Sequence, residues 1–305
     1  MNTNRPIDAI AIAVTVILCA SWGYQNVAIK LALPEMGPLG QGTFRSIGAT
    51  ILVSIFMLQR LSRSPWKKGV GTPGLVAGLL FGIEFILLFV AVAYTDASRA
   101  VMFLYVAPFV VAIGGHFFIQ GERMDLKSSI GVALAFAGVA VALNPGTNVD
   151  FEMLKGDVLA LAAGIFWGLT TLVIRGTELR TAPAAQVLWY QLVVSAVMFS
   201  VAGWWYDDTM FVDVGPVTMA SLLYQTIWVV AITYAVWFAL IARYSATSLS
   251  VITFLTPLFG AAMGHVFLGE ELTSRHMIGV IAVAIGIMLV SMRRSPRGPA
   301  AAALS

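Results

Sequence analysis

The two halves of this 305-residue sequence carry the same pattern, and that repeat limits the possible folds more than any single motif does. Trp22 recurs as Trp167, 145 positions later, and each is followed by glycine. Pro108 recurs as Pro257, 149 positions later. If each half crosses a membrane an odd number of times, the two copies must have opposite orientations in it. The expected division is 1–148 for the first repeat, 149–294 for the second, and 295–305 for a disordered cytoplasmic tail.

Composition indicates that the solvent of this chain is a lipid bilayer. Hydrophobic residues make up 59% of the sequence and charged residues only 11%, whereas soluble domains have about 45–50% and about 25%. The basic residues lie between apolar stretches and not in one patch, which argues against a nucleic-acid partner. The only cysteine, Cys19, cannot form a disulfide within the chain, and the sequence contains no motif for a metal or a cofactor.

Ten apolar stretches have about the 20 residues that a helix needs to cross a hydrocarbon core of about 30 Å. Clusters of charged residues, proline and glycine separate these stretches, and five fall in each half. We therefore predict an all-α membrane protein whose ten transmembrane helices form two inverted five-helix repeats. The predicted spans are 9–31, 39–60, 73–94, 98–120, 127–143, 156–176, 184–205, 217–241, 246–268 and 276–292.

The distribution of basic residues predicts the orientation of the chain. With the N-terminus in the cytoplasm, thirteen lysines and arginines fall in cytoplasmic segments. Four fall on the opposite side, namely Lys30, Arg99, Lys155 and Arg275. Because positively charged loops favour the cytoplasm, both termini are predicted to be cytoplasmic.

Several short motifs, taken together, resemble one family. In the first half they are Trp22-Gly23, Lys30, Pro38, Arg45, Ala93-Tyr94-Thr95-Asp96-Ala97-Ser98, Pro108, Gly121-Glu122, Gly131 and Gly138. In the second half they are Gly156-Asp157, Trp167, Arg175, Tyr244-Ser245-Ala246, Pro257, Gly269-Glu270-Glu271, Gly279 and Gly286. The combination covers nearly the whole chain and resembles the drug/metabolite transporters, which have paired EamA-type repeats of five helices.

This resemblance implies a ten-helix, multi-pass transporter of the bacterial inner (cytoplasmic) membrane, in a family whose members often export amino acids or similar metabolites. Bacterial aromatic amino-acid exporters are the narrower match. Arg99 departs from the family pattern, which usually has a small or apolar residue there. His116 and His265 are not part of the general signature. These departures leave the substrate and the coupling open.

Two charged residues lie well inside predicted spans, away from the span ends. Glu84 is at the middle of the third span, where an ionised acid costs at least about 2.5 kcal/mol. We interpret Glu84 as a ligand for a substrate amino group or as a proton carrier, and the alternative is an interhelical hydrogen bond. Arg45 lies deeper in the second span than a snorkelling side chain, and its guanidinium suits a substrate carboxylate. The alternative for Arg45 is a scaffold role, because the family has an arginine here across members with different substrates.

Pro108 and Pro257 lie at the midpoints of the fourth and ninth predicted spans. Proline at such a position frees a backbone carbonyl and bends the helix. Matching interrupted helices in two halves are typical of a midplane binding site and a hinge. The alternative is a static kink, but in either case these two helices are expected to line the site.

Aromatic and amide side chains near mid-depth are the remaining candidates for a substrate pocket. Aromatic residues more often fill cores or lie at membrane interfaces, so a structural role is the alternative for each of them. Tyr224, Trp228 and Ala235 fall along one α-helical stripe. Such a pocket suits an aromatic or bulky apolar solute with a polar end. The candidates are Trp22, Gln25, Phe81, Tyr105, Trp167, Tyr224, Trp228 and Phe254.

Paired glycines predict where helices pack closely, because a residue without a side chain lets two backbones approach each other. Two pairs have the Gly-x-x-x-Gly spacing and two are separated by two helical turns. They are Gly78 with Gly82, Gly260 with Gly264, Gly131 with Gly138, and Gly279 with Gly286.

These features together predict a secondary transporter of small organic solutes, with export of amino acids or related metabolites by alternating access as the preferred function. No ATP-binding loop is present, so uphill transport must use an ion gradient or exchange, and protons are the candidate ion. The alternatives are a multidrug, sugar or other metabolite transporter or a passive exchanger of the same fold. An intramembrane enzyme is a remote alternative, because no nucleophile and base have a suitable spacing. We expect a monomer without a cofactor.

Overall fold

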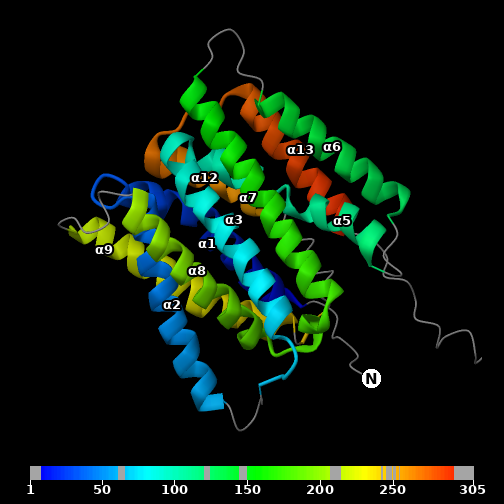
Figure 1. Ribbon diagram of the computed structural model, residues 1–305. Coiled ribbons are helices and arrows are strands. Elements are labelled where there is room, and N and C mark those ends of the chain that lie inside the picture. Colours follow the sequence, from blue (N-terminus) through cyan, green and yellow to red (C-terminus); the bar gives the residue numbers. More distant parts are fainter. Residues whose placement is uncertain are drawn as a thin grey trace, which may run out of the picture.

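The computed structural model of this chain is a bundle of helices (Figure 1). It describes residues 8–60, 66–119, 124–143, 150–206, 214–241, 243–244, 249, 252–253 and 255–291. The helices of the first half are α1 (Ala9–Ala32), α2 (Pro38–Arg60), α3 (Gly71–Tyr94), α4 (Ala97–Leu104), α5 (Ala107–Phe118) and α6 (Leu126–Leu143). Those of the second half are α7 (Phe151–Gly176), the short 3₁₀-helix η1 (Glu178–Thr181), α8 (Ala184–Tyr206), α9 (Pro216–Leu223), the π-helix η2 (Tyr224–Thr233), α10 (Tyr234–Ile241), α12 (Leu255–Leu268) and α13 (Ser274–Ser291).

Seven stretches of helix are long and apolar enough to cross a membrane, and they coincide with seven of the predicted spans. Three shorter apolar helices, Leu126–Ala142, Leu255–Leu268 and Ser274–Val290, occupy the remaining predicted positions. The prediction of an all-helical, multi-pass membrane protein is therefore confirmed for the described residues. The count of ten crossings and the cytoplasmic placement of both termini stay predictions.

Aspartates begin the first helix of each half. Asp8 Oδ1 accepts a hydrogen bond from the backbone N–H of Ala11 at 2.8 Å. Asp150 Oδ1 accepts one from the backbone N–H of Glu152 at 3.0 Å. The first turn of a helix leaves N–H groups unpaired, so an aspartate there satisfies one of them and also favours the positive end of the helix dipole. Local chemistry therefore fixes where α1 and α7 start.

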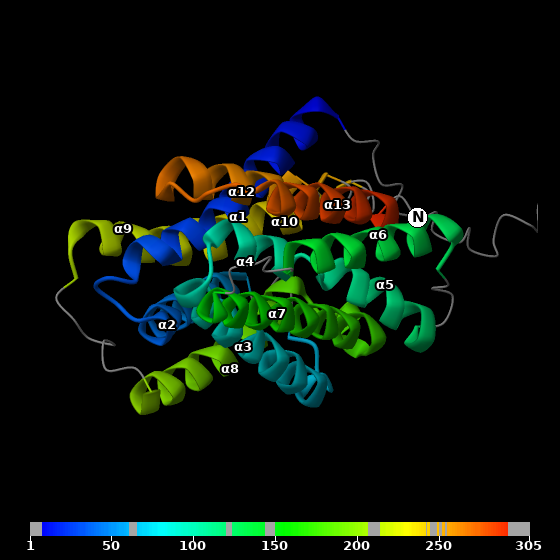
Figure 2. The ribbon, with the colours of Figure 1, turned by 90° about the horizontal axis from the view of Figure 1, so that it is seen from above.

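Helices α6 and α13 lie side by side at one edge of the bundle (Figures 1 and 2). A Cβ added at Gly131 would lie 2.8 Å from the carbonyl oxygen of Gly286, and one added at Gly286 would lie 2.7 Å from that of Gly131. Gly138 and Gly279 approach each other in the same reciprocal way, at 3.1 and 3.0 Å. Residue numbers rise along one helix as they fall along the other, so the two helices are antiparallel. The predicted close-packing role of these glycines is confirmed.

Helix α8 packs between α2 and α3. A Cβ added at Gly78 of α3 would lie 2.7 Å from Val194, and one added at Gly82 would contact Met198. The residue numbers of the contacting positions rise together along the two helices, so α3 and α8 are parallel. The predicted close packing at Gly78 and Gly82 is confirmed. On the other side of α8, the Ser195 hydroxyl donates a hydrogen bond to the Ser46 hydroxyl of α2 at 3.3 Å.

The fourth predicted span is broken in its middle, between α4 and α5. A Cβ added at Gly164 of α7 would lie 2.6 Å from the carbonyl oxygen of Leu104 and 2.9 Å from that of Phe103, so a glycine covers the carbonyls at the break. In the second half, Cys19 of α1 donates its thiol to the carbonyl of Ile252 at 3.6 Å. Cys19 precedes Gly164 by 145 positions and Phe103 precedes Ile252 by 149, so the packing at the two breaks follows the sequence repeat.

Pro108 and Pro257 lie in the first turn of the helices that follow these breaks, α5 and α12. Proline is well tolerated in a first turn, because its missing N–H would have no partner there. The structure shows the interruption before Pro108, between α4 and α5, whereas part of the segment before α12 lies outside the described residues. The hinge role of both prolines stays a prediction, and the position of the prolines differs from a mid-helix kink. The prolines start new helical segments and do not kink continuous ones.

The segment from Tyr224 to Thr233 is a π-helix, which corrects the α-helical stripe expected for the eighth span. A π-helix bonds each residue to the fifth one along, so it has more residues per turn than an α-helix. The side chains of Tyr224, Trp228 and Ala235 therefore do not share one α-helical face. π-Helical segments often occur at functional sites.

Candidate functional site

Arg45 of α2 is the largest fully buried side chain of the described residues, with 0% exposure. Its guanidinium carbon lies 4.0 Å from the centroid of the Phe85 ring and 5.7 Å from that of Phe89. These two phenylalanines are four residues apart on α3, so they present one aromatic face. A cation over an aromatic face gains about 0.5–2 kcal/mol, more where water is excluded. The guanidinium is therefore held against α3 by ring contacts.

Polar atoms of Arg45 and Glu84 lack partners within the described part of the chain. The Nε, Nη1 and Nη2 atoms of Arg45 are buried without a hydrogen bond, and so is Oε2 of Glu84. Glu84 precedes Phe85 on α3 and is 3% exposed. The two groups are within electrostatic range of each other, yet these atoms do not pair directly. Buried polar groups nearly always have hydrogen-bond partners, so a pair of opposite charges without them points to a ligand site.

The polar region continues from Arg45 toward the break in the fourth span. Tyr234, the first residue of α10, lies within electrostatic range of both Arg45 and Glu84. Tyr105, at the break after α4, lies near Tyr234 and beside Thr256. Side chains from α2, α3, α4, α10 and α12 therefore meet around one buried region that also contains the break.

Three predicted aromatic residues lie within this region or next to it. Phe81 packs against Phe85 with ring centroids 4.6 Å apart. Tyr105 and Trp167 of α7 make an edge-to-face contact at 5.3 Å. Aromatic pairs of this geometry stabilise packing and also offer flat apolar surface to a ligand. Their contact with a substrate stays a prediction.

Three other predicted residues join α1 to the π-helix. The indole N–H of Trp22 donates to the Thr233 hydroxyl at 2.9 Å. The Tyr224 hydroxyl donates to the carbonyl of Ser21 at 2.8 Å, and the Trp228 indole N–H donates to the Ser21 hydroxyl at 2.9 Å. These side chains hold η2 against α1, and Trp228 is 39% exposed. The structure does not bring them into contact with Arg45.

Two further candidates complete the predicted set. Gln25 of α1 is buried, with 9% exposure. Phe254 lies outside the described residues. Among the described residues, no three histidine, cysteine, aspartate or glutamate side chains gather as metal ligands would.

Sequence reasoning missed Tyr234 and Thr256. Tyr234 directly follows the π-helix, whose altered periodicity hides the face on which the tyrosine lies. Thr256 directly precedes the repeated Pro257. A buried hydroxyl next to a repeated proline is the signal that would have indicated this residue. Its hydroxyl is buried without a hydrogen bond to any described residue.

The chemistry of these side chains is suited to binding a charged solute. A guanidinium can hold a carboxylate through two parallel hydrogen bonds. A carboxylate can hold an ammonium group, and the Phe81 and Phe85 rings can cover an apolar side chain. Arg45 and Glu84 therefore offer opposite poles to one amphoteric solute.

The chain is similar to known membrane proteins over nearly all of its length. A model of the EamA-like transporter family matches it twice, over residues 9–144 and 154–292. The uncharacterized transporter YvbV of Bacillus subtilis is 26% identical over 297 residues, which cover 96% of this chain and 94% of that protein. A probable amino-acid metabolite efflux pump of Salmonella typhimurium is 28% identical over 297 residues, covering 94% of this chain and 95% of that protein.

A solved crystal structure also has a similar fold. It matches with a TM-score of 0.65 at 18% sequence identity, and the match covers 95% of this chain and 98% of that chain. At this level of identity the likeness concerns the fold alone.

Proposed function

The chain belongs to the EamA-like transporter family, and we propose that it is a secondary transporter that exports amino acids or related amphipathic metabolites across the bacterial inner membrane. The observation that carries this proposal is the buried pair of opposite charges beside the Phe85 ring, in which the three side-chain nitrogens of Arg45 and Oε2 of Glu84 have no hydrogen bond to a described residue. Two opposite charges fit the carboxylate and the amino group of one amino acid. A relative named as a probable amino-acid metabolite efflux pump supports the same substrate class.

The substrate would lie with its carboxylate on the Arg45 guanidinium and its amino group on the Glu84 carboxylate. Its side chain would pack against Phe81 and Phe85, whose rings form a continuous aromatic surface on α3. Glu84 would bind either a proton or the substrate, so proton movement and substrate movement in opposite directions would be coupled. This exchange needs no cofactor and only one copy of the chain.

Alternating access would come from rocking of the two halves about this region. The breaks before Pro108 and Pro257 allow one half of each helix to move while the other stays packed. The residues at the breaks contact α7 and α1 through Gly164 and Cys19. Movement of the half-helix on one side of each break would open one side of the site at a time.

A multidrug or sugar transporter, or a passive exchanger of the same fold, is the second candidate, because the aromatic surface around one acid also suits those solutes. Purified protein in liposomes distinguishes these functions. Labelled tryptophan, phenylalanine, a sugar and a cationic drug are compared in counterflow assays. Amino-acid flux without chemical conversion supports the proposal, flux of the other solutes supports the second candidate, and product formation would indicate an enzyme.

The variant that tests the site is Glu84→Gln, which keeps the shape of the side chain and removes its charge. We expect a folded protein whose flux, or the pH dependence of that flux, is lost. Glu152→Gln is the matched control, because the Glu152 side chain is 67% exposed on the same bundle. If Glu84→Gln transports normally at every pH, Glu84 has no part in the mechanism.

A further inference from the structure

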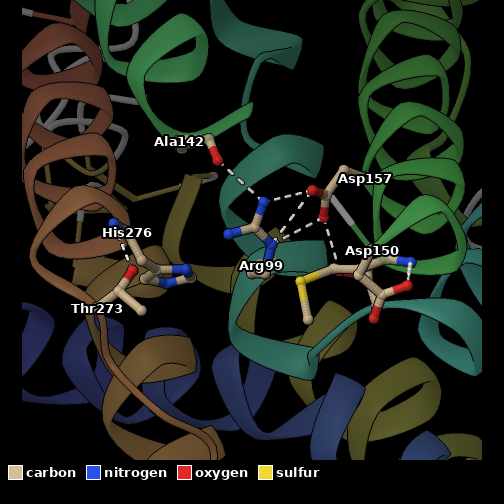
Figure 3. A network of polar contacts seen from close by, with 8 residues as sticks. Arg99, Ala142, Asp150, Asp157, Thr273 and His276 are labelled. Atoms are coloured by element: carbon tan, nitrogen blue, oxygen red, sulfur yellow. Dashed lines mark hydrogen bonds and ion pairs between the residues drawn. The ribbon is translucent and has the colours of Figure 1, made fainter. Parts of the chain in front are cut away.

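A network of polar contacts surrounds Arg99 (Figure 3). Arg99 lies in the first turn of α4, and its Nε donates to Asp157 Oδ1 of α7 at 3.0 Å. Its Nη2 donates to the carbonyl of Ala142 at 2.9 Å, near the end of α6, and also contacts Asp157 Oδ2. One guanidinium therefore joins two helices of the first half to a helix of the second half.

Glu270 fixes the turn of α4 from which Arg99 projects. Its Oε1 accepts the backbone N–H of Ala97 at 2.6 Å, and its Oε2 accepts that of Ser98 at 3.0 Å. Glu270 lies in the segment between α12 and α13 and is 7% exposed. A carboxylate at a helix N-terminus satisfies unpaired N–H groups and favours the positive end of the dipole. A residue of the second half therefore caps a helix of the first.

Helix α1 joins the same network through Lys30. The Lys30 ammonium donates to the carbonyl of Thr95 at 2.6 Å and lies 3.7 Å from Asp96 Oδ1. The Thr95 hydroxyl in turn donates to Asp157 Oδ1 at 2.6 Å. Five parts of the chain are thus connected at one end of the bundle, namely α1, the start of α4, the end of α6, α7 and the α12–α13 segment.

The central contact of this network is shielded from water. The Asp157 side chain is 1% exposed and that of Arg99 is 14% exposed. Exposed ion pairs contribute little because water and salt screen them, whereas removal of one partner from a buried pair leaves the other uncompensated. The Arg99–Asp157 pair therefore opposes any movement that would separate α4 from α7.

The sequence repeat does not reproduce Arg99 in the second half. A shift of 145 to 149 positions carries Arg99 to residues 244–248, which are Tyr, Ser, Ala, Thr and Ser. The contact found there is a hydrogen bond from the Tyr244 hydroxyl to Asp8 Oδ2 at 2.7 Å, in an exposed position. This contact is the counterpart of the one between Thr95 and Asp157, because Tyr244 follows Thr95 by 149 positions and Asp157 follows Asp8 by 149.

We propose that Arg99, Asp157 and Glu270 form a latch that holds the outer end of the transporter closed. The outer placement follows from the predicted orientation, which puts Lys30 and Arg99 on the outer side. The inference rests on alternating access in the proposed function, and it adds that the outer end opens only when this buried network separates. Export then requires the latch to open once in each cycle.

The chain contains its own reporter for this latch. Cys19 is the only cysteine, is 0% exposed, and lies near the middle of α1 beside Thr256. A charged, membrane-impermeant thiosulfonate reagent applied to right-side-out vesicles can modify Cys19 only when the outer end opens. A Cys19→Ala variant gives the background.

We expect Asp157→Asn and Arg99→Gln to be modified from the outside at least about tenfold faster than the native protein, because hydrogen bonds between charged groups shift an equilibrium by about that factor. Lys155→Gln is the matched control on α7, since the Lys155–Glu152 pair is 51% and 67% exposed. Its modification rate is expected to stay native. Glu270→Gln is expected to accelerate modification as well, by loosening the cap of α4.

Folding of each variant is checked by thermal unfolding in detergent. The double variant Arg99→Asp with Asp157→Arg restores a pair of opposite charges, so it is expected to restore slow modification of Cys19. Native rates in the folded single variants would overturn the latch. Equal acceleration in right-side-out and inside-out vesicles would also overturn it, because it would mean general loosening. Acceleration only in inside-out vesicles would overturn the outer placement. The assay needs no substrate, so its result is independent of whether the transported solute is an amino acid.

Discussion

Replacement of Arg45 by methionine together with Glu84 by glutamine is expected to stabilise the folded protein and to stop transport. Three buried nitrogens of Arg45 have no hydrogen bond to the described residues, and an unsatisfied buried donor costs about 1–3 kcal/mol. The contacts with Phe85 and Phe89 at 4.0 and 5.7 Å offset about 2 kcal/mol of this cost at most. A buried pair of charges that is replaced as a whole by uncharged groups of similar volume often stabilises a protein by about 1–4 kcal/mol, whereas removal of one partner alone leaves the other charge uncompensated. We therefore expect a gain of about 1–3 kcal/mol in the free energy of unfolding.

The assay is thermal unfolding in detergent, followed by fluorescence, with and without a transported amino acid. For a chain of this size the gain corresponds to a Tm higher by at least about 2 °C. Substrate at 100 times its Kd is expected to stabilise the native protein by about 2.7 kcal/mol and the variant not at all. Arg180→Met is the control, because Arg180 is exposed and such a change is worth about 0.5 kcal/mol or less.

The opposite result would refute this reasoning in a specific way. If Arg45 is a scaffold residue that holds a neighbouring helix, the double variant is expected to destabilise the protein by about 3–5 kcal/mol. Loss of transport would then follow from loss of structure. Normal transport by the variant would show that the guanidinium does not bind the substrate.

Three further predictions concern packing, the break and pH. Gly286→Leu is expected to lower the free energy of unfolding by about 1–3 kcal/mol, because its Cβ would lie 2.7 Å from the Gly131 carbonyl oxygen. Gly176→Ala is the control, because no atom lies within 4 Å of the added Cβ, and it is expected to leave Tm unchanged or to raise it. Pro108→Ala is expected to keep Tm native and to slow flux in liposomes, because alanine lets α4 and α5 join; unchanged flux contradicts the hinge. Burial raises the pKa of the Asp96 carboxyl above 3.8, and the nearby Glu270 adds to the rise. Because the folded state then binds protons more tightly than the unfolded state, the Tm of the native protein relative to that of Asp96→Asn is expected to fall as the pH rises from 3.8 through the raised pKa. A Tm difference that grows with pH contradicts this assignment.

The helices, their close contacts and the charged centre of the site were predictable from sequence, for a physical reason. A bilayer requires about 20 apolar residues per crossing. A charged residue inside such a stretch is costly to bury, so it stands out as a candidate functional residue. Glu84 and Arg45 are therefore visible in the sequence. The glycine pairs are visible for a similar reason, since small residues allow helices to approach within a lipid environment.

The partners of these residues were not predictable, because they depend on which helices meet. Apolar stretches bounded by lipid have no polar face that shows which side turns toward which neighbour. Asp157 and Arg99 are 58 positions apart in the chain, and nothing local to either indicates the other. The π-helix is a second example, since an α-helical period applied to Tyr224–Thr233 assigns side chains to the wrong faces.

The reciprocal contacts between α6 and α13 have a consequence for how such a chain can arise. Gly131 contacts Gly286, and Gly138 contacts Gly279, so each half offers the other nearly the same surface. An interface of this kind is self-complementary, as in a two-fold symmetric dimer. A half-length ancestor inserted in both directions could therefore have paired with its own inverted copy. Gene fusion would then have freed each copy to change alone, as the single arginine at position 99 and the single acid at position 84 illustrate.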